Sequence, residues 1–194
     1  MVVDRKAFFA TLRKAWGPFK RPQVAGLDAL LDFLEADRDV SDRRWAACML
    51  GNVKWEGADT WKPIVERGGA SYFRQYDPGT AKGARLGNTE PGDGARFKGR
   101  GYSMITGRDN YRRLGVRVGV PLEAEPERAL EPPVAYAILS VGMREGLFTG
   151  KKLSNYFNDT RCDYVNSRRI INGLDRAELI ASYAQVLASA LGND

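Results

Sequence analysis

Apolar residues recur at helical spacing through the first third of the chain. Asp4 precedes one stripe of them, which Gly17-Pro18 ends, and Pro22 begins another. Side chains three and four positions apart share one face of a helix, so each stripe predicts a helix with a buried face. The apolar positions are Phe8, Phe9, Leu12 and Trp16 in the first stripe, and Val24, Leu27, Leu30, Leu31 and Leu34 in the second. Residues 1–38 are therefore predicted to form a helical pair packed on the remainder of the chain.

A third stripe leads to a carboxylate. Ser41 is the expected N-cap of this helix, and its helical spacing, continued, reaches Glu56. The apolar positions are Trp45, Cys48, Met49 and Val53. Glu56 follows Trp55 and lies near Trp61, so we expect partial shielding from water, which favours the protonated form that a general acid needs. From these residues alone, an ordinary solvated acid at a helix end is the alternative.

Between residues 57 and 98 the helical period disappears. Glycine and proline clusters interrupt the chain, as at Gly68-Gly69 and Asp77-Pro78-Gly79, and aromatic residues recur between them. Short extended segments are expected near residues 71–75 and 97–106. Because long irregular segments in a compact domain tend to be functional, we expect this region to form the wall of a cleft.

Helical patterns resume after Asp109. Residues 129–145 predict a largely buried helix, and residues 163–171 predict a helix that Asn172-Gly173 ends. A capping-box-like pair at 175 and 178 precedes the last apolar stripe. The patterns together predict a mainly α fold of the α+β class. It consists of bundle-like helices with a small, loop-rich β region lining a cleft, in a single domain over residues 1–194.

Composition narrows the chemistry. A chain of 194 residues with 43% hydrophobic residues is long enough for one domain with its own core. It contains no histidine, which excludes His-based triads and the usual zinc sites. Cys48 and Cys162 are far apart, and Cys48, among apolar residues, is expected to be buried. We expect no metal and no cofactor, and we assign the chemistry to carboxylates.

The formal charge of +6, with a pI near 9.4, favours an anionic partner. Nucleic acid, an acidic membrane surface and a bacterial wall polymer all fit that charge. Against nucleic acid, Arg and Lys are scattered and no recognition motif is present. The uncharged segment 132–143 is shorter than the ~20 residues of a membrane span, so no stable membrane insertion is expected. No signal peptide is visible, and we expect synthesis in the cytoplasm, with a separate route of release to any cell wall.

Residues 99–111 form an unusual stretch. They read Gly-Arg-Gly-Tyr-Ser-Met-Ile-Thr-Gly-Arg-Asp-Asn-Tyr. The glycines allow tight turns or a close approach to another surface. Residues 102–106 fit a brief strand, and Thr106, Asn110 and Tyr111 supply groups that bind sugars and position water. Taken alone, the stretch is equally well a surface turn before a helix.

This stretch resembles the signature of the family 19 chitinases and of the phage endolysins related to them. Two further blocks agree in order, namely Glu56 followed by Pro63-Ile64-Val65-Glu66-Arg67-Gly68, and Ile170-Ile171-Asn172-Gly173. The resemblance spans roughly residues 40–190. It implies a lysozyme-like fold and a glycoside hydrolase.

The resemblance also implies roles for individual residues. Glu56 and Glu66 match the catalytic acid and base of the family, and Thr106 matches the hydroxyl residue that helps to hold the attacking water. Breaking a glycosidic bond requires two carboxyl groups in different environments. From the residues themselves, Arg67 and a wetter loop would keep Glu66 ionised, and a plain surface pair with Arg67 is the alternative.

Four more residues are candidates for substrate binding. Asn110 and Asn172 match family positions that contact the substrate, and amides suit N-acetyl sugars. Tyr102 and Tyr111 are either sugar contacts or packing residues, with packing the commoner role for tyrosines beside a core.

Two positions depart from the family pattern. The family often has His before its catalytic Glu, where this chain has Trp55, and often has Gln where this chain has Met104. The missing amide at Met104 weakens a direct transfer of chitin specificity. The short interval between the two glutamates is more similar to the endolysins.

The leading hypothesis is an endolysin-type, N-acetylmuramidase-like lysozyme. It would cleave peptidoglycan glycan strands by acid–base catalysis with inversion and act as a monomer. A chitinase is the alternative within the same class, and a lytic transglycosylase would need only one essential acid. From another class, the chain could be a catalytically silent, basic wall-binding module.

Overall fold

The structure is a computed structural model that describes residues 1–192. These residues divide into two compact units. Unit 1 comprises residues 1–62 together with the chain from Gly142 onward, and unit 2 comprises residues 63–141. The chain passes from unit 1 to unit 2 after Lys62 and returns within the helix α8 (Pro132–Glu145).

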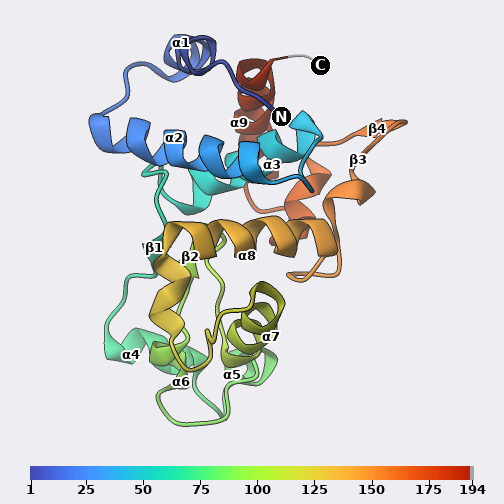
Figure 1. Ribbon diagram of the computed structural model, residues 1–194. Helices are drawn as coiled ribbons and strands as arrows, with labels where there is room; N and C mark the ends of the chain where they lie inside the picture. Colours follow the sequence, from blue (N-terminus) through green and yellow to red (C-terminus); the bar gives the residue numbers. More distant parts are fainter. Residues whose placement is uncertain (193–194) are drawn as a thin grey trace. The chain divides into compact units, whose positions relative to one another are not determined.

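Four helices make up most of unit 1 (Figure 1). They are α1 (Arg5–Trp16), α2 (Arg21–Ala36), α3 (Arg43–Glu56) and α9 (Ala177–Leu191). α9 packs against both α3 and α1. A Cβ at Gly51 of α3 would lie 3.1 Å from the Cβ of Ala184, so a glycine there lets α3 and α9 approach closely.

The predicted apolar stripes form the core of unit 1. The side chains of Phe8, Leu12 and Leu30 are fully buried, as expected from their spacing. Asp4 caps α1 by accepting a hydrogen bond from the backbone N–H of Ala7, as predicted. Outside the core, Arg5 of α1 forms ion pairs with three acidic side chains of α2, which are Asp28, Asp32 and Glu35.

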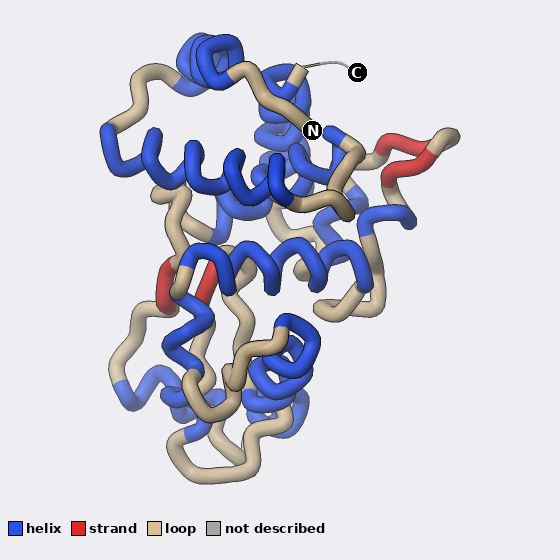
Figure 2. The backbone as a smooth tube through the Cα atoms, in the orientation of Figure 1, coloured by secondary structure: helices blue, strands red, loops and turns tan. Residues whose placement is uncertain are grey.

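Unit 1 also contains a short hairpin and two 3-10 helices. The strands β3 (Phe157–Asn158) and β4 (Arg161–Cys162) pair antiparallel, with Phe157 opposite Cys162 (Figure 2). The 3-10 helices are η3 (Leu153–Asn155) and η4 (Asn166–Ile170). Both cysteines are free thiols, and Cys48 is buried as predicted.

Unit 2 combines short helices with a two-stranded sheet. β1 (Ile64–Val65) pairs antiparallel with β2 (Arg100–Gly101), with Val65 opposite Arg100. The helical elements are α4 (Ala70–Phe73), η1 (Arg74–Tyr76), α5 (Ala81–Arg85), α6 (Asp93–Arg96), α7 (Arg108–Val118) and η2 (Pro126–Leu130), followed by the first part of α8. Buried Asp93 of α6 binds the Arg108 guanidinium of α7 through both of its carboxylate oxygens, at 2.7 and 2.8 Å.

Several predicted elements differ from those observed. Residues 71–75 are helical rather than extended. A single helical turn is enough to bury the apolar side chain of Phe73, and no alternating strand is needed. Residues 102–104 form a turn, with Met104 in the left-handed region at φ 51°, where a strand was predicted. Residues 163–171 form a 3-10 helix only over their second half.

Two predicted caps are also wrong. Asp42, not Ser41, caps α3 by accepting from the backbone N–H of Arg44. α9 begins after Arg176, which is left-handed at φ 57° and provides no side-chain cap, so the expected capping box is not formed. In both cases the helix begins one or two residues away from the predicted position, and sequence patterns do not define helix ends more precisely than that.

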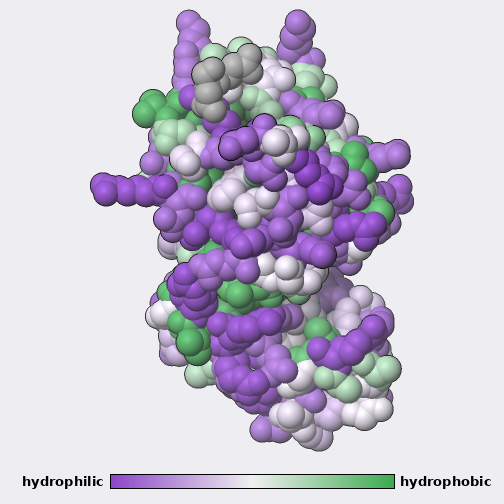
Figure 3. All heavy atoms as spheres, turned by 90° about the vertical axis from the view of Figure 1, so that its right-hand side faces the viewer, coloured by the Kyte–Doolittle hydropathy of each residue, from purple (hydrophilic) through white to green (hydrophobic). Residues whose placement is uncertain are grey.

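The predicted fold class, mainly α with a small β region, is confirmed. Hydrophilic side chains cover most of the face shown in Figure 3, and apolar ones gather only in small patches there. Within residues 1–192, no helix has both the length and the apolar character to span a membrane.

Candidate active site

Glu56 is the last residue of α3 and lies beside a buried arginine. Its Oε1 is 2.7 Å from Nη2 of Arg168, which η4 contributes from far along the chain. The Glu56 side chain is 19% exposed and that of Arg168 only 2%. The predicted partial shielding of Glu56 is therefore present, but with an ionic partner that the sequence pattern did not indicate.

The same arginine is fixed by other groups of unit 1. Its Nη1 donates to Oδ1 of Asn52 (2.8 Å), and the amide nitrogen of Asn52 donates to the carbonyl of Cys48 one turn earlier in α3. Asn52 and Arg168 are both buried, so their polar atoms depend on these bonds. The polar Asn52 within an apolar helix face was the one sequence signal of this network.

The segment after Glu56 has an uncommon backbone. Ala58, Asp59 and Trp61 all have positive φ values, between 45° and 62°. Such conformations cost free energy in residues other than glycine and persist where the surroundings impose them. Asp59 is held here by Nζ of Lys54 (2.6 Å), and its carbonyl accepts from the amide of Gln23.

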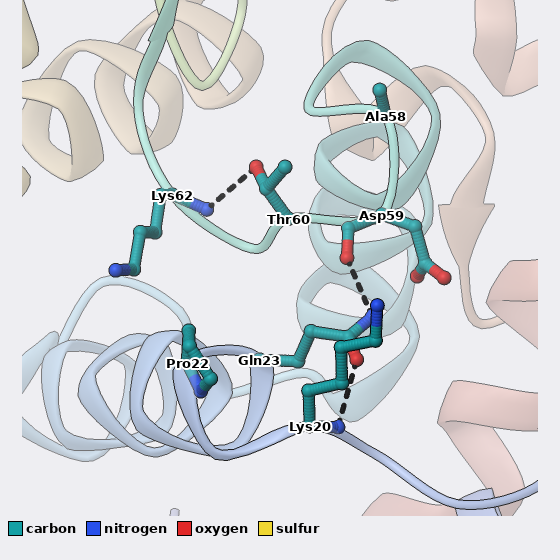
Figure 4. A pocket seen from close by; sticks show the side chains of 7 residues that line it. All are labelled: Lys20, Pro22, Gln23, Ala58, Asp59, Thr60 and Lys62. Atoms are coloured by element: carbon teal, nitrogen blue, oxygen red, sulfur yellow. Dashed lines mark hydrogen bonds between the residues drawn. The ribbon is translucent and has the colours of Figure 1, made fainter.

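This segment also borders an open hollow of about 480 Å³ (Figure 4). Its lining residues are Lys20, Pro22, Gln23, Ala58, Asp59, Thr60 and Lys62. Hydrogen bonds from Gln23 to the carbonyl of Asp59 and from the N–H of Lys62 to Thr60 fix its walls. None of the seven predicted site residues lies in this lining.

Glu66, in unit 2, directly follows β1. Its backbone N–H donates to the carbonyl of Gly99 (2.8 Å), and the N–H of Gly99 donates back to Oε2 of the carboxylate (2.9 Å). The hydroxyls of Tyr72 (3.1 Å) and Tyr76 (3.0 Å) both donate to Oε1. Three neutral donors therefore hold the carboxylate.

Arg67 was expected to help keep Glu66 ionised, with a surface ion pair between the two residues as the alternative. Within residues 1–192, the hydrogen-bond partners of the Glu66 carboxylate are Tyr72, Tyr76 and Gly99, and its arginine neighbour in sequence forms no ion pair with it.

The two tyrosines were missed as site residues by the sequence patterns. α4 and η1 place them four residues apart, with ring centroids separated by 6.2 Å. Burial, together with the hydrogen bonds to Tyr72 and Glu66, raises the pKa of Tyr76 well above its ordinary value. Tyr76 therefore remains a hydroxyl donor at neutral pH. In the sequence, these tyrosines stand out only as aromatic residues that recur in a polar region.

The turn after β2 contains Met104, and Thr106 follows shortly after it in unit 2. The Thr106 hydroxyl donates to the carbonyl of Met104 (3.0 Å), which commits its hydrogen and leaves its oxygen as an acceptor. A Cβ built on Gly99 would lie 3.1 Å from Cε of Met104 and 3.2 Å from Oε2 of Glu66. The water-holding role of Thr106 remains a prediction.

The two candidate asparagines lie in different surroundings. Asn110, in the first turn of α7, donates to the carbonyl of Thr106 (2.7 Å) and accepts from Arg113 (2.9 Å). Asn172 of unit 1 is exposed, and its Oδ1 accepts from the N–H of Gly173 (2.8 Å). Substrate contacts by these residues stay predictions.

Tyr102 and Tyr111 are packing residues in this structure. The Tyr102 side chain is 2% exposed and that of Tyr111 is 0% exposed, which leaves neither in reach of a substrate. The Tyr111 hydroxyl donates to the carbonyl of Lys98 (2.7 Å) and accepts from buried Arg100 (3.0 Å). Burial raises the pKa of each tyrosine to about 12. For both, the packing alternative replaces the sugar-contact interpretation.

The candidates are therefore divided between the units. Unit 1 holds Glu56 and Asn172, and unit 2 holds Glu66, Tyr102, Thr106, Asn110 and Tyr111. Among residues 1–192, no three Cys, Asp or Glu side chains are grouped in a way that could hold a metal ion.

Comparison with solved structures assigns the fold. Chitinase C from Streptomyces griseus HUT6037 is 19% identical to the chain, with a TM-score of 0.62 over 99% of this chain and 79% of its own. A bacterial family 19 chitinase is 16% identical (TM-score 0.59; 100% and 97% covered), as is a class IV chitinase of that family from Zea mays (TM-score 0.54; 97% and 92% covered). The chain therefore has the fold of the family 19 chitinases, as the three sequence blocks predicted.

The similarity to these proteins is found in the fold and not in the overall sequence. No protein-family profile matches it, and no curated protein is significantly similar to it.

Proposed function

We propose that this protein is a glycoside hydrolase that cleaves polymers of N-acetylated amino sugars by acid–base catalysis. The observation that carries the proposal is the structural similarity to family 19 chitinases over nearly the whole chain. The three motif blocks of that family occur in the same order in the sequence, and one of them contains both Glu56 and Glu66.

Each carboxylate has a role in this reaction. Glu56 gives its proton to the glycosidic oxygen as the bond from that oxygen to the anomeric carbon breaks. Glu66 takes a proton from the water that forms the new bond to the same carbon, which inverts its configuration. The two groups have different partners, an arginine for Glu56 and neutral hydroxyl and amide donors for Glu66.

Peptidoglycan is the substrate we propose first. The formal charge of +6 favours an anionic wall polymer over a neutral one. Met104, in place of the amide frequent in chitinases, also favours a substrate other than chitin. On this proposal the protein is an endolysin-type lysozyme that acts as a monomer on the cell wall after its release.

Chitin is the second candidate. It is supported by the solved structures with the same fold, which are named as chitinases. Both polymers contain N-acetylglucosamine, so a site that accepts one shares chemistry with the other.

Mass spectrometry of the released products tests the proposal. The wild type, Glu56→Gln and Glu66→Gln would be incubated with purified peptidoglycan and with chitin oligomers. We expect reducing-end products from the wild type and at least a hundredfold lower rate from each variant, since one acid–base group typically contributes ~10²–10⁴-fold. Anhydro-muramyl ends with full activity of Glu66→Gln would indicate a transglycosylase. Wall binding without cleavage by the wild type would indicate a silent binding module.

A further inference from the structure

The two oxygens of the Glu66 carboxylate have different surroundings. Oε1 accepts from the hydroxyls of both Tyr72 (3.1 Å) and Tyr76 (3.0 Å). Oε2 accepts one hydrogen bond, from the backbone N–H of Gly99 (2.9 Å). A carboxylate offers about four acceptor positions, two on each oxygen. Oε1 is therefore saturated, whereas Oε2 retains one acceptor position.

The surroundings of Oε2 keep that position open. A side chain at Gly99 would start 3.2 Å from Oε2, so glycine is what leaves this oxygen uncovered. The methyl group of Met104 would lie 3.1 Å from the same Cβ built on Gly99, and a thioether has no hydrogen to donate. Neither neighbour competes with water for the free acceptor position.

We infer that Tyr72 and Tyr76 are positioning residues that occupy Oε1, so that Oε2 is the oxygen that accepts the proton of the attacking water. This inference rests on the hydrolase activity proposed above. In that step the water oxygen bonds to the anomeric carbon, the bond from that carbon to the glycosidic oxygen breaks, and Glu56 protonates the leaving oxygen. The water proton goes to Oε2.

Tyr76 suits this role because it is a donor that remains neutral. Burial of Tyr76 and its bonds to Tyr72 and Glu66 raise its pKa, so it keeps the hydrogen that it donates. The backbone N–H of Glu66 donates to the carbonyl of Gly99, and the N–H of Gly99 donates to Oε2, so both the backbone and the carboxylate of Glu66 are fixed. Tyr72 is 45% exposed, so a direct contact with a sugar is the competing role for it.

The first test compares Tyr72→Phe, Tyr76→Phe and the double variant with the wild type. The control is Tyr156→Phe in unit 1, whose ring lies against Arg161. We expect kcat to fall about tenfold in each single variant and about a hundredfold in the double variant, with KM within about twofold, because hydrogen bonds to the charged form of a carboxylate stabilise that form. The acid limb of the kcat profile should move to higher pH in the double variant.

The second test addresses Oε2 itself. Gly99→Ala introduces a Cβ beside Oε2, whereas Gly69→Ala introduces one with no atom of the described chain within 4 Å. We expect Gly99→Ala to lower kcat more than tenfold and Gly69→Ala to match the wild type. Circular dichroism and Tm would verify that all variants are folded.

Several outcomes would overturn the inference. An unchanged kcat and pH profile in the double Phe variant would remove the positioning role, and a change of KM alone in Tyr72→Phe would make Tyr72 a substrate contact. Full activity of Gly99→Ala would exclude Oε2 as the proton acceptor. A wild type without glycosidase activity, or a fully active Glu66→Gln, would instead refute the proposed function, and the positioning role would fall with it.

Discussion

At the scale of residues, the two candidate carboxylates are held by different chemistry. Glu56 is paired with one buried cation, Arg168, while Glu66 accepts from two phenols and one amide. A cation acts through charge and, when buried, depends on its partner, whereas neutral donors mainly orient the group that they bind. Changes at Arg168 should therefore affect stability as well as activity.

Arg168→Gln should lower the free energy of unfolding by about 2–4 kcal/mol, because it leaves a shielded carboxylate without its partner. It also removes the donor to Asn52, which is 1% exposed. Urea unfolding measures the change, and kcat should fall in parallel. The adjacent, exposed Arg169→Gln is the matched control, expected within about 0.5 kcal/mol of the wild type. Equal stability of the two variants would contradict the bracing role.

Met104→Gln should raise kcat/KM on chitin oligomers relative to peptidoglycan, because it restores the amide that is frequent at this position of the family motif. The side chain is partly exposed and its methyl group lies near Gly99 and Glu66. Met104→Leu keeps the apolar character and is expected to leave the ratio unchanged. The test is to measure kcat/KM of both variants on chitin oligomers and on peptidoglycan. An equal ratio of the two kcat/KM values in both variants would show that Met104 does not determine specificity.

At the scale of elements, a cluster around Lys54 links α1, α3 and α9. The Lys54 ammonium lies 4.3 Å from the ring of Trp16 and 5.1 Å from that of Tyr183, and it is paired with Asp59. The ring of Trp61, at 5.5 Å, completes the cluster. A cation beside aromatic faces is stabilised by their negative potential, more strongly when water is excluded. This cluster holds the segment that follows Glu56.

Lys54→Met should lower the free energy of unfolding by about 1–3 kcal/mol, since methionine keeps the volume but loses the cation–π and ionic contacts. The side chain is 9% exposed, so water cannot replace those contacts fully. Thermal and urea unfolding would measure the loss. As a control, Lys14→Met changes an exposed residue of α1 and should stay near the wild type. A Lys54→Met variant as stable as the control would show that the cluster contributes little.

The Asp93–Arg108 pair makes stability depend on pH. Burial alone would raise the pKa of Asp93, but the bonds from Arg108 and from the backbone N–H groups of Glu90 and Thr89 lower it overall. A lowered pKa stabilises the fold above the ordinary range of aspartate, and the contribution is lost as pH falls through the folded value. Asp93→Asn should therefore be less stable than the wild type at pH 7, with the difference narrowing below pH about 4. A difference that is constant from pH 7 to 3 would contradict this.

At the scale of the whole molecule, the net charge of +6 should govern association with the substrate. Attraction between exposed charges is screened over about 8–10 Å at ordinary salt. Raising NaCl from about 20 to 300 mM should therefore weaken binding to anionic peptidoglycan severalfold. Binding to neutral chitin is the matched control and should change little. Sedimentation of the bound protein with each polymer measures both. Equal salt dependence for the two polymers would show that charge does not select the wall.

The sequence by itself determined the helical stripes, the caps of the first helix and the motif blocks. Periodic burial depends on the spacing of apolar residues along one segment, as at Phe8, Leu12 and Leu30, and the structure confirms it. The sequence also indicated a mainly α fold of the family 19 chitinase type, because the order of the motifs can be recognised even where overall identity is low.

Only the tertiary structure decided which groups surround each carboxylate. Arg168 reaches Glu56 from a distant segment, and an irregular turn directs Tyr72 and Tyr76 to one oxygen of Glu66. It likewise decided that Tyr111, within the most distinctive motif, packs inside its unit. Such contacts depend on where separate segments meet and on turns without periodicity, and no spacing along the chain encodes either of these.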